Sequence, residues 1–241
     1  MEALPIITCI MPTYGRPDYV NESVAMFLAQ DYPHKELIIL NDCLGQQFDG
    51  DFAEVRIINQ PSRFTSLGEK RNACIRLAKG SVIAIWDDDD VYLPWRLSFS
   101  RSEMDRLGTP FYRPAEFWAY WGEDDLHDNQ SVPGWVSHAW VMFSKELWER
   151  VGGYPPVDLG EDAQFLERIH RELGSPFIKY ELDREDRVGI LRGLSQYQHM
   201  SIGGGARPLD TTPGNYPITP ADIADPLLRG VRDRLVAAHL R

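Results

Sequence analysis

The chain has 241 residues, a length that suffices for one large α/β domain or two small ones with a buried core. The hydrophobic fraction of 43% is that of an ordinary folded protein. Its formal net charge of −11 disfavours nonspecific binding to nucleic acid and to anionic membranes. The three cysteines, which are Cys9, Cys43 and Cys74, are odd in number and lack metal-type spacing, so they argue against a disulfide framework and a zinc site. No basic leader and no apolar run of about 20 residues is present, and we therefore expect a soluble cytoplasmic protein.

The first half of the chain alternates strand and helix patterns. Ile6–Met11 is apolar and rich in β-branched residues, as in a strand buried on both faces. After the loop Pro12–Pro17, Asp18 is the expected cap of a helix that ends before Pro33. The pattern continues with strands at Glu36–Leu40 and Val55–Ile58, a helix from a Thr65 cap to about Lys79, and a strand at Ser81–Trp86. This alternation predicts βαβ units and a parallel sheet.

The second half has a different composition. Phe111–Trp121 is dense in aromatic residues, and Trp135–Phe143 has the pattern of a strand. A short helix is expected at Lys145–Val151 after a Ser144 cap, and another helix is expected to open at Gly160-Glu161-Asp162. Late strands are expected at Phe177–Tyr180 and Val188–Leu191. From Gly203 onward Gly and Pro dominate until a final helix from about Pro220, and this tail either packs on the body or contacts a partner.

Four carboxylates, Asp87–Asp90, directly follow the buried strand that ends at Trp86. Like charges this close repel one another and need a counter-ion, which a hard divalent cation can supply. Mg²⁺ or Mn²⁺ typically takes one or two carboxylates and completes its shell with substrate phosphates. A solvated acidic turn is the alternative, but the carboxyl end of a parallel strand favours a ligand site.

Three further segments are candidates for the same site. Pro12-Thr13-Tyr14-Gly15 and Asn41-Asp42 follow neighbouring strands, where an aromatic face and a carboxylate can hold a nucleobase. Lys70-Arg71-Asn72 can bring a cation to a diphosphate. The alternatives are an ordinary turn for the first two segments and a solvated helix face for the third.

Two candidates come from the second half. Glu161 and Asp162 open a helix, where the N-terminus favours a charged carboxylate that can act as a general base, although a simple helix cap accounts for the same pattern. His199 is a candidate metal ligand, with an ordinary exposed or hydrogen-bonded histidine as the alternative.

In this order, these segments resemble the family 2 glycosyltransferases of GT-A fold. The resemblance runs from about Ile6 to Ser201 and includes Val151-Gly152-Gly153-Tyr154 together with Gly160-Glu161-Asp162. Asn41 stands where the family has an acid, and Lys70 stands where it has Ala. The resemblance implies a Rossmann-like, mixed but mostly parallel sheet flanked by helices. The expected parts are a GT-A domain at 1–202, with a nucleotide-sugar half at about 1–108 and an acceptor half at 109–202, and a C-terminal extension at 203–241.

The resemblance also implies roles for individual residues. Pro12, Thr13, Tyr14, Arg16, Asp42, Arg71, Asp87 and Asp88 would bind the donor nucleotide. Asp87 and Asp89 would bind Mn²⁺ or Mg²⁺, with His199 as a further candidate ligand. Asp162 would deprotonate the acceptor hydroxyl, with Glu161, Trp118 and Trp121 on the acceptor side. The reaction would invert the anomeric centre, and the lack of a Gln-X-X-Arg-Trp element favours a single transfer over polymerisation.

Two other functions remain open from the sequence. A nucleotidyltransferase shares acidic metal residues, but normally has a Gly-rich basic loop, whereas Pro12–Pro17 has one Gly and one Arg. A noncatalytic carbohydrate-binding module would use the tryptophans for stacking and would not need Asp87–Asp90. For a transferase, the expected donor is a UDP-sugar and the acceptor is a glycan, a lipid-linked sugar or a small molecule. A nucleic-acid acceptor is disfavoured by the net charge.

Overall fold

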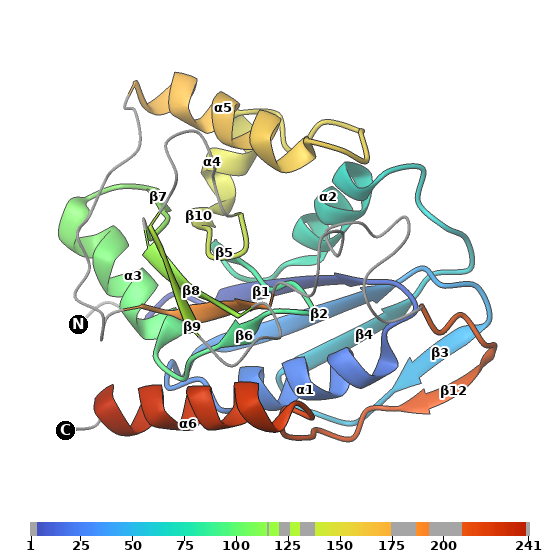
Figure 1. The fold of residues 1–241 in the computed structure, drawn as a ribbon. Coiled ribbons are helices and arrows are strands. Elements are labelled where there is room, and N and C mark those ends of the chain that lie inside the picture. The colour runs from blue at the N-terminus through green and yellow to red at the C-terminus, as the bar shows by residue number, and fades with distance from the viewer. Residues whose placement is uncertain are drawn as a thin grey trace.

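The computed structural model describes residues 4–114, 116–120, 126–130, 138–174, 187–192 and 209–239. A six-stranded sheet runs through its centre (Figure 1), in the order β4-β2-β1-β5-β10-β7. The first four of these strands are parallel, and β10 runs antiparallel to both of its neighbours. The expected mixed, mostly parallel sheet is therefore confirmed. The strands are β1 (Ile7–Thr13), β2 (Lys35–Asn41), β4 (Val55–Asn59), β5 (Val82–Ile85), β7 (Phe111–Tyr112) and β10 (Met142–Ser144).

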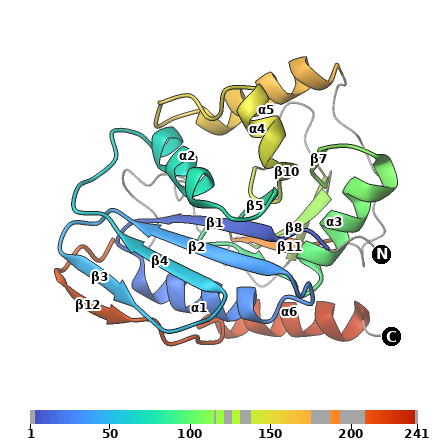
Figure 2. The same ribbon diagram turned by 180° about the vertical axis from the view of Figure 1, so that it is seen from behind.

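Helices cover both faces of this sheet (Figures 1 and 2). Successive residues of β1 explain why, because Cys9 and Met11 join one core cluster and Ile10 joins the other. The first cluster takes side chains from α1, α3 and α6, and the second takes them from α2, α4 and α5. The helices are α1 (Pro17–Leu28), α2 (Leu67–Leu77), α3 (Arg96–Leu107), α4 (Lys145–Arg150), α5 (Glu161–Leu173) and α6 (Pro226–His239).

A second sheet of four strands, in the order β6-β11-β8-β9, contains most of the described aromatic segment. The ring of Tyr92, in strand β6 of this sheet, is buried in the core. It stacks on the Trp86 ring with 3.8 Å between the ring centroids and meets the Trp140 ring edge-on. The four strands are β6 (Val91–Tyr92), β8 (Glu116–Tyr120), β9 (Leu126–Gln130) and β11 (Gly189–Arg192).

The C-terminal segment returns to the first half of the chain. Strand β12 (Gly214–Pro217) pairs in parallel with β3 (Gln46–Asp49), and α6 lies below α1 in Figure 1. The Asp210 N–H donates to the Gly15 carbonyl at 2.9 Å. Gly45 has a φ of +81°, and a Cβ there would meet Pro213 at 2.8 Å, so the approach depends on glycine. Of the two expectations for the tail, packing on the body is the one observed.

Several predicted boundaries are wrong. Within Trp135–Phe143, the described residues His138–Val141 are not a strand, and β10 begins at Met142. Trp140 explains the error. Its indole is fully buried although the residue lies in a turn, and an apolar aromatic residue at this position made the segment look like a buried strand. The final helix begins at Pro226 rather than near Pro220. The predicted strand Phe177–Tyr180 lies outside the described residues.

Two predicted helix caps are also wrong. Arg16 is the N-cap of α1, and Pro17 takes the first position, where a missing N–H costs nothing. Asp18 therefore lies within the first turn. Ser66, rather than Thr65, caps α2 by accepting from the Glu69 N–H. Among the described residues, no helix is long and apolar enough to cross a bilayer.

Candidate active site

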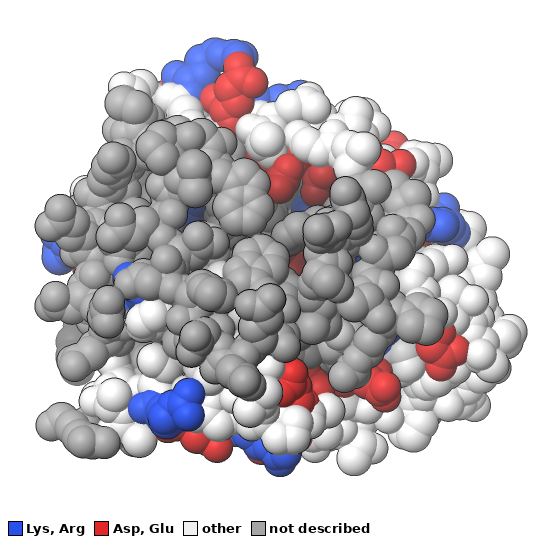
Figure 3. Space-filling model, in the orientation of Figure 1, with Lys and Arg blue, Asp and Glu red and all other residues white. Residues whose placement is uncertain are grey.

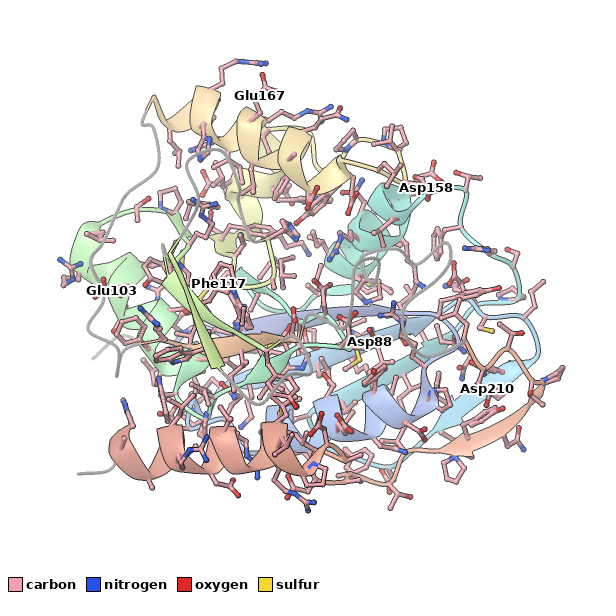
Figure 4. All side chains as sticks on the ribbon, in the orientation of Figure 1. Asp88, Glu103, Phe117, Asp158, Glu167 and Asp210 are labelled. Atoms are coloured by element: carbon pink, nitrogen blue, oxygen red, sulfur yellow. The ribbon has the colours of Figure 1, made fainter. Side chains whose placement is uncertain are left out.

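The carboxyl ends of β1, β2 and β5 bring three polar loops to one edge of the sheet. The loop after β5 carries Asp87–Asp90, the loop after β1 carries Thr13 to Arg16, and Asp42 follows β2. The Thr13 hydroxyl donates to Asp88 Oδ2 at 2.6 Å, which joins two of the loops. Figure 4 shows Asp88 near the middle of the molecule, with Asp158 above it and Asp210 below and to the right. The loops that the sequence places after these strands therefore do meet at one edge of the sheet, and their binding of a donor stays a prediction.

Arginines supply counter-charges to the acidic loop. Arg16 Nη1 lies 2.9 Å from Asp88 Oδ1 and 2.8 Å from Asp89 Oδ2. Arg71 Nη1 lies 3.0 Å from Asp87 Oδ1. The expected counter-ion is thus supplied in part by arginine side chains of the chain itself, and the binding of a divalent metal ion stays a prediction.

The acidic loop nevertheless fits a hard divalent cation. Asp87 and Asp89 are partly exposed, whereas Asp88 is nearly buried with a hydrogen bond to each oxygen. Two accessible carboxylates are what Mg²⁺ or Mn²⁺ uses when substrate phosphates complete its shell. Among the described residues, no group of three or more His, Cys, Asp or Glu side chains forms a metal site by itself.

The candidate base pocket is small and contains an ion pair that the sequence analysis missed. Lys70 Nζ donates to Asp42 Oδ1 and to the Thr13 carbonyl, and Asp42 Oδ2 accepts from the Phe64 N–H at 3.0 Å. Burial lowers the pKa of the Lys70 ammonium, and Asp42 opposes this shift. The Arg63 guanidinium lies 4.3 Å above the Tyr14 ring. The sequence did contain a sign of the Lys70–Asp42 pair, because Lys70 stands where the family has an alanine that could not bind Asp42. The cavity of about 20 Å³ is lined by Tyr14, Asp42, Arg63, Phe64, Ser66, Leu67, Lys70 and Asp158.

Arg71 connects the two halves of the candidate site. Besides its contact with Asp87, its Nε lies 3.4 Å from Glu161 Oε1, at the start of α5. Burial raises the pKa of the Glu161 carboxyl, and Arg71 opposes this shift. Glu161 is thus buried against Arg71 in this structure. It is Asp162, the next residue, that is the more exposed of the two.

Asp162 lies in the first turn of α5, where Gly160 is the N-cap. Its Oδ1 accepts from the Ala163 N–H at 2.7 Å. Nearby, the Nε2 of the buried His138 lies 2.7 Å from the Tyr154 hydroxyl. Burial and the charge of Arg71 lower the pKa of the His138 imidazole, whereas the charge of Asp162 favours its protonation. Asp162 thus directly follows the residue that contacts Arg71, and its own printed bond is the local one to Ala163.

The remaining site predictions have different outcomes. Trp118 is buried, with the Arg187 guanidinium 4.2 Å from its ring, so it belongs to the core in this structure and presents no open stacking face. Pro12 lies within β1. Trp121 and His199 lie outside the described residues.

We expect acid to destabilise the fold through His138. Burial, with a smaller effect from Arg71, lowers the pKa of His138 from 6.5 to about 4. The unfolded chain then binds a proton between these values and the folded chain does not, so stability falls as pH drops from 6.5 towards 4. Between pH 7 and 4, the wild type should lose roughly 3 kcal/mol more unfolding free energy than His138→Gln. Urea titrations of both proteins across this range check the prediction, and parallel curves would contradict it.

A larger cavity, of about 260 Å³, lies where the C-terminal segment crosses the loop after β1. Arg16 and Asp89 are at one side, and the ring pair Phe48–Tyr216 is at another. Figure 3 shows acidic side chains gathered on this part of the face, near the positions of α1 and β12. Its lining also includes Gly15, Pro17, Asp18, Tyr19, Asn21, Leu209, Asp210, Asn215 and Pro217.

Comparison with known proteins agrees with this architecture. Residues 8–109 match the model of Glycosyl transferase family 2. An Escherichia coli (strain K12) protein named as the colanic acid biosynthesis glycosyl transferase WcaA is 31% identical over 131 residues, which cover 51% of this chain and 46% of that protein. The chain thus aligns with less than half the length of this relative.

Two solved structures share the fold. TarS residues 1–349 from S. aureus, in complex with UDP-GlcNAc, align with a TM-score of 0.62 at 16% identity and cover 97% of this chain and 71% of that one. The mannosyltransferase PcManGT from Pyrobaculum calidifontis, in complex with GDP-Man and Mn²⁺, aligns with a TM-score of 0.56 at 17% identity and covers 77% of this chain and 56% of that one. The chain has a GT-A fold, and its residues 8–109 are similar to glycosyl transferase family 2.

Proposed function

We propose that this chain transfers one sugar from a nucleotide-sugar, with a UDP-sugar as preferred donor, to an acceptor hydroxyl, with inversion and with a divalent metal ion. The observation that supports this most strongly is the convergence of Asp42, Asp87, Asp89 and Arg71 at one edge of the sheet, next to the start of α5. The match of residues 8–109 to Glycosyl transferase family 2 supports a glycosyl transfer in general, and the TarS complex supports a UDP-sugar as donor.

The donor side of the reaction uses residues from the first half of the chain. In this proposal the base lies against the Tyr14 ring and the Asp42 carboxylate, which line one small cavity with Lys70. Arg71 can bind the ribose or the diphosphate, since a guanidinium matches phosphate oxygens in a two-pronged geometry. Asp87 and Asp89 would hold the metal ion, which when bound neutralises charge on the departing nucleoside diphosphate.

The acceptor side of the reaction depends on α5. Asp162 accepts the proton of the acceptor hydroxyl, and the oxygen then attacks the anomeric carbon from the side opposite the leaving diphosphate. One displacement inverts the anomeric configuration and needs no covalent intermediate. The acceptor would be a glycan, a lipid-linked sugar or a small molecule.

The two rival functions lead to different experimental results. A nucleotidyltransferase would release pyrophosphate from a nucleoside triphosphate, and a carbohydrate-binding module would release no nucleotide. Residues Asp87–Asp90 and their arginine partners favour an enzyme over a binding module. The buried position of Trp118 also disfavours a stacking platform at that residue.

We expect UDP-sugars to be the best donors in a turnover screen with Mn²⁺. The pairing of the Tyr14 ring with the Asp42 carboxylate motivates this expectation, and the similar TarS structure is a complex with UDP-GlcNAc. The measurement is the release of nucleoside diphosphate from UDP-, GDP- and dTDP-sugars, together with calorimetric affinities for UDP, GDP and dTDP. A clear preference for GDP would overturn the UDP assignment, and no nucleotide release from any donor in the presence of acceptor mixtures would oppose the transferase proposal.

A further inference from the structure

One guanidinium nitrogen of Arg16 occupies the place of a cation between two carboxylates. Its Nη1 lies 2.9 Å from Asp88 Oδ1 and 2.8 Å from Asp89 Oδ2. The other oxygen of Asp88 accepts from the Thr13 hydroxyl. Arg16 is therefore bonded to the carboxylate, Asp89, that the proposed function gives to the metal ion.

Arg16 borders an open cavity and is not held in place by a capping bond to its helix. Its side chain is 15% exposed and, like Asp89, lines the cavity of about 260 Å³. Arg16 is the N-cap of α1, but its side chain makes no capping bond, and only its carbonyl accepts from the Val20 N–H. A change of the Arg16 rotamer would therefore leave the backbone bonds of α1 intact.

We propose that Arg16 is an exchangeable counter-ion. In the ligand-free chain it neutralises Asp88 and Asp89 and competes with a divalent ion for Asp89. When the donor binds, the diphosphate accepts the Arg16 guanidinium, and Asp89 becomes available to the metal ion. The inference rests on the proposed function, because it needs a diphosphate donor and a divalent ion to meet at Asp89.

Simple charge balance explains why such an exchange is favourable. Two carboxylates without a cation would repel one another, and a guanidinium removed from them without a new anion would lose strong charge-assisted bonds. The donor diphosphate and the metal ion arrive with opposite charges, so the guanidinium and Asp89 each gain a charged partner, and Asp88 keeps its bond from the Thr13 hydroxyl. Nucleotide and metal should therefore bind cooperatively, and each should raise the affinity for the other by the same factor.

The test is a calorimetric titration of Mn²⁺ alone into the ligand-free chain. Arg16→Gln should bind Mn²⁺ about tenfold or more tightly than the wild type, because the competing cation is gone. Arg16→Met removes the same charge and serves if the Gln variant is poorly folded. Arg16→Lys keeps the charge and should stay close to the wild type. Arg101→Gln, which removes one positive charge from an exposed pair on α3, controls for the change in net charge.

A second titration measures the coupling between metal and nucleotide. UDP should raise the Mn²⁺ affinity of the wild type by a larger factor than that of Arg16→Gln, and UDP binding without metal should weaken in the variant. Mn²⁺ affinity that is the same in Arg16→Gln, Arg16→Met and wild type would overturn the exchange. So would Arg101→Gln tightening Mn²⁺ binding as much as Arg16→Gln does.

These results are separable from the proposed function. If the wild type transfers sugar but the Arg16 variants bind Mn²⁺ as the wild type does, the exchange alone is wrong. If the Arg16 variants bind Mn²⁺ more tightly but the wild type turns over no donor, the role of Arg16 as a counter-ion stands and the transferase proposal fails.

Discussion

Asp162→Asn is expected to lower kcat by ~10²–10⁴-fold while UDP affinity stays near that of the wild type. Asparagine keeps the size of aspartate and can still accept from the Ala163 N–H, so the start of α5 should be preserved. It cannot accept the proton of the acceptor hydroxyl. Turnover and calorimetric UDP binding, measured on the same preparation, decide whether the carboxylate acts as a base.

Glu167→Gln is the matched control for this experiment. Glu167 lies on the outer side of the same helix (Figure 4) and pairs with Arg171 at the surface. The control removes one negative charge from α5 without touching the site, so it should leave kcat unchanged. If Asp162→Asn also retains wild-type turnover, Asp162 is a helix-start residue only, and another group must act as the base.

Asp89→Asn should reduce transfer by roughly 10³-fold or more, because the proposed metal ion would lose a charged ligand that helps to stabilise the leaving diphosphate. The same variant should lose the part of UDP binding that depends on Mn²⁺. Titrating UDP into both proteins with Mn²⁺ and then with EDTA measures this part directly. The wild type should bind UDP more tightly with metal, and the variant should show little difference.

Asp49→Asn, an exposed change of equal charge on β3, controls for general electrostatic effects. Wild-type transfer that persists at full rate in EDTA would contradict metal dependence altogether. Full activity of Asp89→Asn in Mn²⁺ would instead show that the metal, if used, binds without Asp89.

The parts of the fold with continuous apolar runs were predictable from the sequence. The run Ile6–Met11 matches β1, and Ser81–Trp86 contains β5, because strands buried on both faces need apolar residues at every position. The candidate site followed from the same reasoning, since Asp42 and Asp87–Asp90 come directly after such strands. Their places at one sheet edge are therefore a consequence of parallel topology.

Other features depend on contacts that a local pattern does not encode. Strands β3 and β12, with the sequences QQFD and GNYP, are short and largely polar, and they are strands because each pairs with the other. The charges of Arg16 and Arg71 were visible, but their pairing with Asp88, Asp89 and Asp87 required the geometry of three loops. Trp140 misled the strand prediction because its indole fills the core from a turn.

The pairing of β3 with β12 also has a consequence for the order of folding during synthesis. Gln46 and Asp210 bond to each other across 164 residues of sequence. At about 5–20 residues per second, the ribosome delivers the second partner roughly 10–30 s after the first. The parallel strands of the first half can pair in that interval, whereas the Gly15 carbonyl can accept its bond from the Asp210 N–H only after residue 210 has been synthesised. A nascent chain arrested before residue 209 would therefore carry the carboxylates of the site but lack one wall of the cavity beside Arg16.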